Sequence, residues 1–190
     1  DQPRSRGLGD VYKRQILKAK SFVGDEPFVI ALGDDIVYND KPVAKQLIEN
    51  YSKYQSSIVG CQEVKESDVS KYGIVKPSKS LDEKTVEMAD FIEKPSIEEA
   101  PSRLACLGRY LLTPKIFEYL EKTEPGKGGE IQLTDAIVAM MKDGEKVLAY
   151  NFDGKRYDIG NKFGLLKANI EFGLRNEETR EELLEYLKNI

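Results

Sequence analysis

PFVIALGDDIVYND, residues 27–40, runs from an apolar segment directly into two adjacent carboxylates. The segment from Phe28 to Leu32 is too short for a helix and rich in β-forming residues, which predicts a strand. Its continuous apolarity favours burial on both faces, as in a central parallel strand. Ligands of open α/β sheets bind beyond the carboxyl ends of such strands, where Asp34 and Asp35 would emerge. The alternative is that Asp34 only caps the following turn.

The pattern of elements on either side of this strand predicts an α/β fold with a mixed sheet. A helix over 42–55 and a strand over 56–64 complete a β-α-β unit, residues 27–64, which we expect to cross over right-handed. Residues 71–95 indicate two strands around a polar turn at 78–84. Further elements follow in the order strand 105–113, short helix 114–123, glycine-rich loop 124–130, helix from an N-cap near Thr134 to Gly144, strand, turn and strand end 147–161, and helices 162–175 and 177–190.

Composition narrows the classes of function. A length of 190 residues favours one domain, 1–190, with 177–190 as a C-terminal helix. The net charge of -4 is spread along the chain without a basic run, so nucleic acid and anionic membranes are not expected as partners. Histidine is absent, which excludes imidazole bases, serine triads and histidine-ligated zinc for this chain. Any chemistry must therefore depend on carboxylates, lysines and backbone groups.

The two cysteines, Cys61 and Cys106, stand singly in apolar surroundings without metal-site or redox-pair spacing. They are expected to be small buried residues of a protein in a reducing compartment. No apolar run approaches the ~20 residues that span a bilayer. These features predict a cytoplasmic protein.

Three further motifs offer groups suited to a phosphorylated sugar. FIEKPS places Glu93, an acceptor for sugar hydroxyls, beside Lys94, a compact cation for a phosphate. YGIVKP places Gly73 at a strand start, where backbone could approach a ligand closely. The adjacent carboxylates of Asp34 and Asp35 are hard oxygen ligands suited to Mg²⁺, and RYDIGN places Asp158 at another strand end, where a third acidic group could complete the metal site. A surface Glu-Lys pair, a turn glycine and a helix cap at Asp158 or Asn161 are the respective alternatives.

The segment KGGEIQLTDA, residues 127–136, contains paired glycines before a helix, but no GxxxxGK[ST] or GxGxxG pattern occurs in the chain. A loop and helix cap is the favoured interpretation, and contact of the glycines, Glu130 or Thr134 with a ligand or partner is the alternative.

Taken together, LGDD, YGIVKP, FIEKP, ACLGRY, GGEIQLTDAI and YDIGNKFG resemble, in this order, the UTP-glucose-1-phosphate uridylyltransferases of the sugar-1-phosphate nucleotidyltransferase family. The resemblance runs from about Phe22 to Glu177. It implies a Rossmann-like nucleotidyltransferase fold with a mixed, mainly parallel sheet. It also implies Mg²⁺-dependent uridylyl transfer from UTP to glucose 1-phosphate, which yields UDP-glucose and pyrophosphate. A homo-oligomer is expected for the full-length protein.

The resemblance also implies roles for individual residues. Asp34 would be the principal Mg²⁺ ligand and Asp158 the second acidic position, and both would be catalytic together with Lys94. The remaining substrate-binding positions would be Gly73 and Glu93 on the glucose hydroxyls, the backbone near Cys106 beside the sugar, and Gly7 near the base; Lys94 would pair with the sugar phosphate.

The chain departs from the family at its start. The family's first strand and its glycine-rich G-x-G-T-R loop, which grips the triphosphate, have no match here, so we expect a chain that begins within a longer protein and lacks the first β-α segment. Residues 1–15 are basic and lack an apolar period, and GLG at Gly7 to Gly9 is followed by Asp10 where the family has His and Ala. We therefore expect the chain alone not to turn over UDP-glucose.

Two other functions stay open. One is a related transferase of the thymidylyltransferase type, because nucleotide choice depends largely on the unmatched loop. The other is a non-catalytic binding or assembly module in which the strand-end acids are caps. In that case EETREELLEYLKNI, with Leu183, Leu184 and Leu187, would pack on a partner subunit.

Overall fold

A computed structural model describes residues 8–122 and 132–190 of the chain. Its strands are β1 (Phe28–Ala31), β2 (Asp35–Tyr38), β3 (Ser57–Glu63), β4 (Gly73–Ser80), β5 (Thr85–Glu93), β6 (Leu104–Leu112), β7 (Val147–Asn151) and β8 (Lys155–Asp158). Its α-helices are α1 (Leu8–Val23), α2 (Val43–Tyr54), α3 (Ile116–Lys122), α4 (Leu133–Lys142), α5 (Lys162–Arg175) and α6 (Glu177–Lys188), and a 3₁₀ helix spans Glu66–Lys71.

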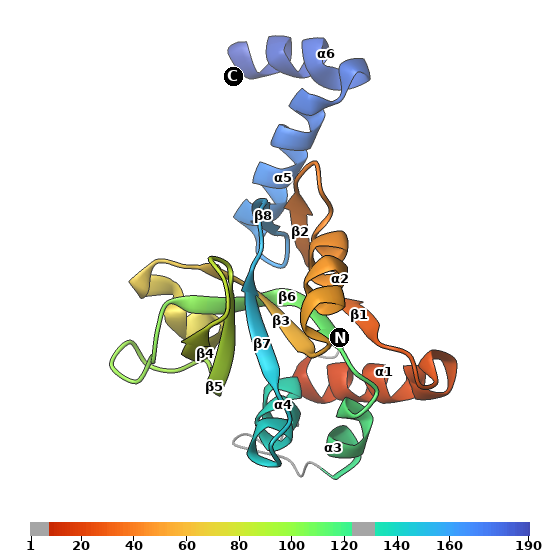
Figure 1. The fold of residues 1–190 in the computed structure, drawn as a ribbon. Helices are drawn as coiled ribbons and strands as arrows, with labels where there is room; N and C mark the ends of the chain where they lie inside the picture. The colour runs from red at the N-terminus through yellow and green to blue at the C-terminus, as the bar shows by residue number, and fades with distance from the viewer. Residues whose placement is uncertain (1–7, 123–131) are drawn as a thin grey trace, which may run out of the picture.

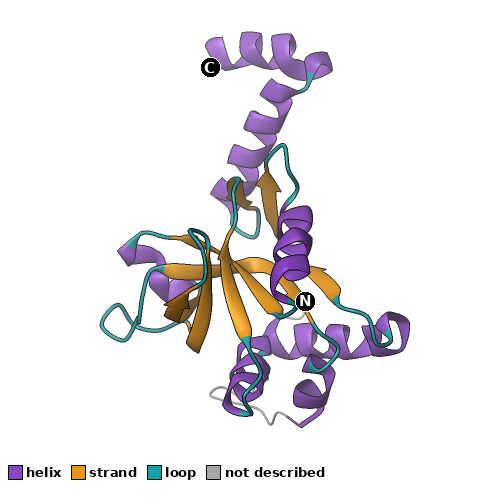
Figure 2. Cartoon of the chain, in the orientation of Figure 1, coloured by secondary structure: helices purple, strands orange, loops and turns teal. Residues whose placement is uncertain are grey.

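Six strands form a central sheet in the order β1-β6-β3-β7-β5-β4, with helices on both sides (Figures 1 and 2). The predicted mixed α/β sheet is therefore confirmed. Within the described ranges, however, β3–β7 is the one parallel pair, and all other strand pairings are antiparallel. The expectation of a mainly parallel sheet is wrong for this part of the chain, because β6 lies between β1 and β3 and runs against both.

The position of β6 between β1 and β3 also corrects the prediction that β1 is a central parallel strand. This strand pairs antiparallel with β6 and lies at the edge of the described sheet, neither central nor beside a parallel neighbour. Its apolar run has a different cause: Phe28 and Ile30 pack on one hydrophobic cluster, and Val29 packs on the other. Continuous apolarity therefore indicated that both faces are covered, but not which strands lie alongside.

The two clusters form the layers on either side of the sheet. One contains Ile16 of α1, Phe117 of α3 and Met140 of α4 against the side chains of that face. The other contains Val43 and Leu47 of α2. A pocket forms at the carboxyl end of β1, beside the start of β4 and the end of β5, and α1 and α4 supply part of its lining.

Strand β2 is an element that sequence reasoning missed. It follows β1 almost directly and pairs antiparallel with β8, so that Asp35 lies opposite Asp158. The predicted β-α-β unit thus contains an extra strand, and its two main strands have β6 between them. Only the fold brings β8 to this segment, because residues 35 and 158 are distant in sequence.

The two closing helices are confirmed. Helix α5 packs on the two-stranded sheet, where the guanidinium carbon of Arg175 lies 4.2 Å from the centre of the Tyr38 ring and its Nη2 is 2.9 Å from the Tyr157 hydroxyl. Helix α6 continues beyond α5 and projects away from the central sheet (Figure 1). In the part of the chain that is described, no helix is long and apolar enough to cross a bilayer.

Local capping differs from expectation at α4. Thr134 lies inside the helix, and Gln132 is the N-cap, with its backbone N–H donating to Asp135 Oδ2 at 3.4 Å. Thr134 was a plausible cap by residue type, but its hydroxyl has another partner, described below. Helix α3 begins at Ile116, two positions after Pro114, because Thr113 and Pro114 first form a turn that accepts the amides of Ile116 and Phe117.

Cys61 of β3 and Cys106 of β6 lie opposite each other on neighbouring strands. Both are free and buried, as predicted. Burial raises the pKa of the Cys61 thiol well above its usual value and that of Cys106 to about 12. We expect iodoacetamide at pH 8 to modify both thiols of the folded chain very slowly, since burial lowers the thiolate fraction of each, and for Cys106, with its pKa at about 12, by about 1,000-fold. Mass spectrometry with a urea-unfolded control measures this, and equal rates in both states would contradict it.

Candidate active site

One cavity, of about 290 Å³, gathers the residues that the sequence singled out. It lies where the ends of β1, β5 and β8 and the starts of β2 and β4 meet β6 and α4. Six predicted site residues line it, namely Asp34, Gly73, Glu93, Lys94, Cys106 and Asp158. Gly7 and residues 127–131 lie outside the described residues.

Asp34 and Asp158 converge at one end of the cavity. The Ile159 amide donates to the Asp34 carbonyl oxygen at 2.9 Å, which ties the two segments together. A Cβ atom placed on Gly160 would lie 3.2 Å from Asp158 Oδ1 and 3.4 Å from Asp34 Oδ2, so both carboxylates border the same small volume. The fold therefore brings together the acidic groups of two separate strand ends.

The capping alternatives have different outcomes for these acids. The Asp34 carboxylate makes no hydrogen bond or ion pair with any residue in the described ranges. Asp158 Oδ1 accepts from the Gly160 amide at 3.1 Å, while Asn161 caps α5 by accepting from the Gly164 amide at 2.6 Å. Asn161 is therefore the N-cap of α5, and Asp158 is not. The second carboxylate oxygen of Asp158, Oδ2, lies 3.9 Å from Arg156 Nη2.

This donor set fits a magnesium ion better than a metal that needs a complete protein cage. Across residues 8–122 and 132–190, no three Asp, Glu, Cys or His side chains are clustered closely enough to hold a metal. Magnesium, however, is commonly held by one or two carboxylates together with waters and substrate phosphates. Asp34 and Asp158 could supply that share of the coordination.

At the other end of the cavity, Gly73, Glu93 and Thr134 form a close corner. Gly73 of β4 lies opposite Glu93 of β5. Thr134 of α4 donates its hydroxyl to Glu93 Oε2 at 2.8 Å, so one oxygen of this carboxylate is held in place and the other is available to a ligand. The segment KGGEIQLTDA favours a loop and helix cap over ligand contact for Thr134, and only the fold reveals its bond to Glu93.

Neighbouring side chains of the protein require a glycine at position 73. A Cβ atom there would lie 2.7 Å from a Phe91 ring carbon and 2.9 Å from Glu93 Oε2. Real Cβ contacts are not this short, so any side chain would displace the ring or the carboxylate.

If the chain binds the sugar nucleotide that the resemblance implies, Gly73→Ala should lower the affinity for UDP-glucose at least about tenfold, because small displacements of positioning groups have large effects. The affinity for UDP, which lacks the sugar, should change little. Calorimetry with both ligands tests this, and Gly144→Ala, which strains a backbone φ of 87° outside the cavity, controls for a loss of stability without a change at the site. An equal loss for the two ligands would contradict a sugar-specific role.

Lys94 has an unusual backbone. Its φ is 45°, in the left-handed region that non-glycine residues rarely adopt, and it precedes Pro95, which favours extended backbone. Its amide donates to the Tyr72 carbonyl oxygen at 3.0 Å. The ammonium is exposed and has no ion pair or hydrogen bond within the described part of the chain. Backbone strain of this kind clusters at functional sites. Here the strained residue carries an unpaired ammonium and lines the cavity.

Between the two ends lies a buried ion pair that sequence reasoning missed. Arg156 Nε pairs with Asp35 Oδ1, and its Nη1 donates to the Tyr72 hydroxyl at 2.9 Å. Burial raises the pKa of Asp35, and the hydrogen bond and charge of Arg156 offset part of this rise. Burial alone would lower the pKa of Arg156, but its bonds to Asp35 and Tyr72 raise it above the ordinary value. A single arginine within RYDIGN carries no pattern from which this partnership could be predicted.

Gly108 of β6 explains how Asp35 fits. Its φ is 64°, and a Cβ atom would lie 2.8 Å from Asp35 Oδ2. Arg109 beside it donates to the Leu32 carbonyl oxygen at 2.9 Å and also bonds the Asp35 carbonyl oxygen. The two adjacent aspartates therefore have different environments: Asp35 is buried and held by Arg156, while Asp34 is exposed at the cavity.

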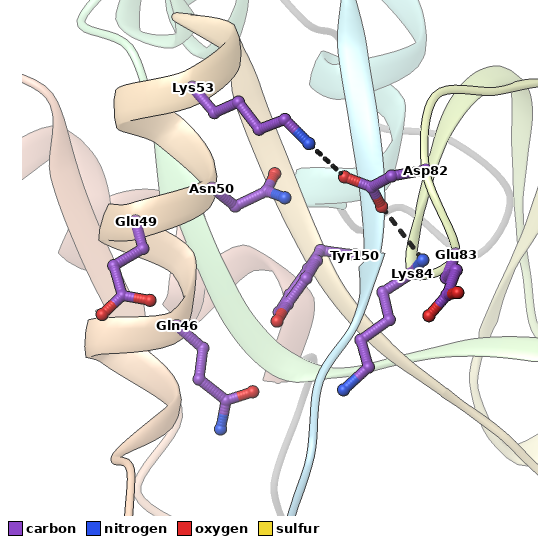
Figure 3. A pocket seen from close by; sticks show the side chains of 8 residues that line it. All are labelled: Gln46, Glu49, Asn50, Lys53, Asp82, Glu83, Lys84 and Tyr150. Atoms are coloured by element: carbon purple, nitrogen blue, oxygen red, sulfur yellow. Dashed lines mark hydrogen bonds and ion pairs between the residues drawn. The ribbon is translucent and has the colours of Figure 1, made fainter.

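A second cavity, of about 400 Å³, lies between α2, the turn at 81–84 and Tyr150 (Figure 3). The Asp82 carboxylate in it is already occupied: Lys53 binds Asp82 at 2.8 Å, and the Lys84 amide donates to Asp82 Oδ1 at 3.0 Å. Burial would raise the pKa of Asp82, but hydrogen bonds from Lys53 and Tyr54 outweigh it and hold that pKa well below the usual range. None of the predicted site residues lines this cavity, so it is not the candidate site.

Similarity to known proteins extends over most of the chain that builds this cavity. The family model described as nucleotidyl transferase matches residues 9–173. The chain belongs to this family.

Within the nucleotidyl transferases, one similar relative is UTP--glucose-1-phosphate uridylyltransferase 2 of Staphylococcus saprophyticus. It is 47% identical over all of this chain, which spans 63% of the relative's length. A solved structure of UDP-glucose pyrophosphorylase complexed with UDP-glucose has a TM-score of 0.82 at 42% identity, over 92% of this chain and 65% of that one.

A more distant neighbour among the nucleotidyl transferases is a putative glucose-1-phosphate thymidylyltransferase from Bacillus anthracis. Its TM-score is 0.66 at 25% identity, over 88% of this chain and 61% of that one. The chain is therefore similar to both types, and more so to the uridylyl enzymes.

Proposed function

We propose that this chain provides the sugar-phosphate and cation half of a site that transfers a uridylyl group from UTP to glucose 1-phosphate. The single observation that carries the proposal is the convergence of Asp34, Asp158, Glu93 and Lys94 on one cavity. The chain spans under two thirds of the length of its uridylyltransferase relatives, which is why the activity is stated as a proposal.

In the proposed reaction, a phosphate oxygen of glucose 1-phosphate attacks the α-phosphorus of UTP. The new P–O bond forms as the bond to pyrophosphate breaks. The nucleophile is already anionic, so no general base is needed, in accord with a chain that contains no histidine. Catalysis then consists of positioning and charge neutralisation.

Each residue has a defined task in this scheme. Glu93, held by Thr134, accepts hydrogen bonds from the glucose hydroxyls, and the absent side chain of Gly73 leaves room for this carboxylate. The unpaired ammonium of Lys94 binds the sugar phosphate. Asp34 and Asp158 would hold Mg²⁺, which neutralises phosphate charge when bound.

The thymidylyl alternative has less support, because identity and structural similarity are both lower for that type of relative. The assembly-module alternative treats the acids as caps, and Asp34 makes no cap within the described residues. Uridylyl transfer is therefore the preferred function.

The test is calorimetric titration of the 190-residue chain with UDP-glucose. We expect binding that depends on Mg²⁺ and falls at least about tenfold when EDTA removes the metal, because each ionic contact of this type contributes about 1.5–3 kcal/mol. Asp34→Asn should bind as weakly with Mg²⁺ as the parent does without it.

Asp40→Asn, at an exposed carboxylate that does not line the cavity, is the control and should leave the affinity unchanged. Absence of UDP-glucose binding by the parent chain would overturn the proposal and favour the assembly module. Tighter binding of a deoxythymidine diphosphate sugar would favour the thymidylyl type instead.

A cytoplasmic location and a homo-oligomer belong to the same proposal. The two buried free thiols support a reducing compartment. Exposed apolar side chains on the projecting helices, Phe163, Leu166 and Tyr186, support contact with another subunit.

A further inference from the structure

Arg156 occupies the boundary between the two halves of the cavity, and the proposed function gives it no task. Its side chain is 15% exposed, and three of its groups are in use. Nε pairs with Asp35, Nη1 donates to the Tyr72 hydroxyl at 2.9 Å, and the guanidinium carbon lies 4.8 Å from the centre of the Tyr72 ring. These contacts hold the guanidinium in one orientation.

The partners of Arg156 lead to opposite ends of the cavity. Asp35 adjoins Asp34 and lies opposite Asp158 in the two-stranded sheet, which is the cation end. Tyr72 adjoins Gly73, and its carbonyl oxygen accepts the Lys94 amide at 3.0 Å, which is the sugar end. Arg156 thus links the two-stranded sheet to the start of β4 at the cavity, while Arg109 of β6 makes a second link through the Asp35 carbonyl oxygen.

We propose that Arg156 is a positioning residue, which sets the distance between the Asp34–Asp158 carboxylates and the Gly73–Lys94 corner for a sugar phosphate and its cation. The inference rests on the proposed function. It depends on the planar fork of arginine, which bonds two partners at fixed angles, whereas lysine offers a single mobile ammonium.

A purely structural role would have a different signature. If Arg156 only adds stability, its replacement lowers the melting temperature but leaves ligand affinity unchanged well below that temperature. If it positions the site, replacement also weakens the ligand and loosens the two backbone contacts that it organises. Those contacts are the Lys94 amide on Tyr72 and the Ile159 amide on Asp34.

The experiment compares the parent chain with Arg156→Lys, which keeps the charge. We expect UDP-glucose affinity with Mg²⁺, measured by calorimetry, to fall about tenfold or more, because misplacement of positioning groups by an ångström has effects of that order or larger. In the ligand-free chain, hydrogen exchange of the Lys94 and Ile159 amides should become faster. Arg103→Lys is the control, since Arg103 makes an exposed ion pair with Glu63 away from the cavity.

Tyr72→Phe provides a second variant, which removes only the hydroxyl. Its loss of affinity should be smaller than that of Arg156→Lys. The double variant should bind no more weakly than Arg156→Lys alone, because the hydroxyl acts through Arg156. Additive losses would show that the Tyr72 hydroxyl affects binding independently of Arg156. They would overturn the claim that this hydroxyl acts by holding Arg156.

The outcomes separate the two proposals. If the parent binds UDP-glucose and Arg156→Lys binds equally well, or if neither amide exchanges faster, the positioning role is overturned and the proposed function stands. If the parent chain does not bind UDP-glucose, the proposed function fails and the role of Arg156 fails with it.

Discussion

Lys94→Ala is expected to weaken the binding of UDP-glucose by about 10- to 100-fold, since a hydrogen bond to a charged group contributes roughly 1.5–3 kcal/mol. The ammonium has no partner in the described part of the chain, so its removal leaves no protein group unsatisfied. The whole effect should therefore fall on the ligand. Calorimetry in the presence of Mg²⁺ measures it.

Two further variants sharpen this result. Lys94→Arg keeps a cation and should retain part of the affinity. Lys76→Ala removes an exposed lysine from β4, outside the cavity, and should have no effect. Full affinity of Lys94→Ala would show that the sugar phosphate does not bind at this residue.

Phe117→Ala is expected to lower the free energy of unfolding by about 3–5 kcal/mol, the range for removing a large aromatic side chain from a core. Phe117 is 2% exposed, and its ring stacks on Phe28 with a centroid distance of 5.1 Å. The loss would leave a cavity between α3 and the edge strand β1. Urea denaturation followed by circular dichroism measures the change.

The matched control is Phe22→Ala, because Phe22 is 94% exposed and the substitution removes the same atoms. Its effect should stay within about 0.5 kcal/mol, as is usual for surface positions. Similar losses for the two variants would show that α3 does not cover the sheet as described.

The element types could be predicted well because their signals are local. Helices α2, α5 and α6 follow from apolar spacing, and β1 follows from its short apolar run. Neighbouring strands could not be predicted in the same way. The antiparallel β6 between β1 and β3 depends on contacts between residues about 40–85 positions apart, for which local patterns carry no information.

The candidate site divides along the same line. Asp34, Gly73, Glu93, Lys94 and Asp158 were identified as residues that suit a phosphorylated sugar and a cation, and the fold places all of them on one cavity. Arg156 was missed, and the role of Thr134 beside Glu93 could not be predicted, because each acts through a partner from a distant element: Glu93 for Thr134, and Asp35 with Tyr72 for Arg156.

Residue chemistry was thus readable from the amino-acid order alone: carboxylates at strand ends, a lysine before a proline, and no histidine for acid-base work. These properties belong to single residues and to their immediate neighbours. The tertiary structure alone decided which carboxylate is exposed, because adjacent Asp34 and Asp35 differ only in what surrounds them. Asp35 is enclosed by Gly108 and Arg156, from strands that the chain brings together only when it folds, and Asp34 is thereby left facing the cavity.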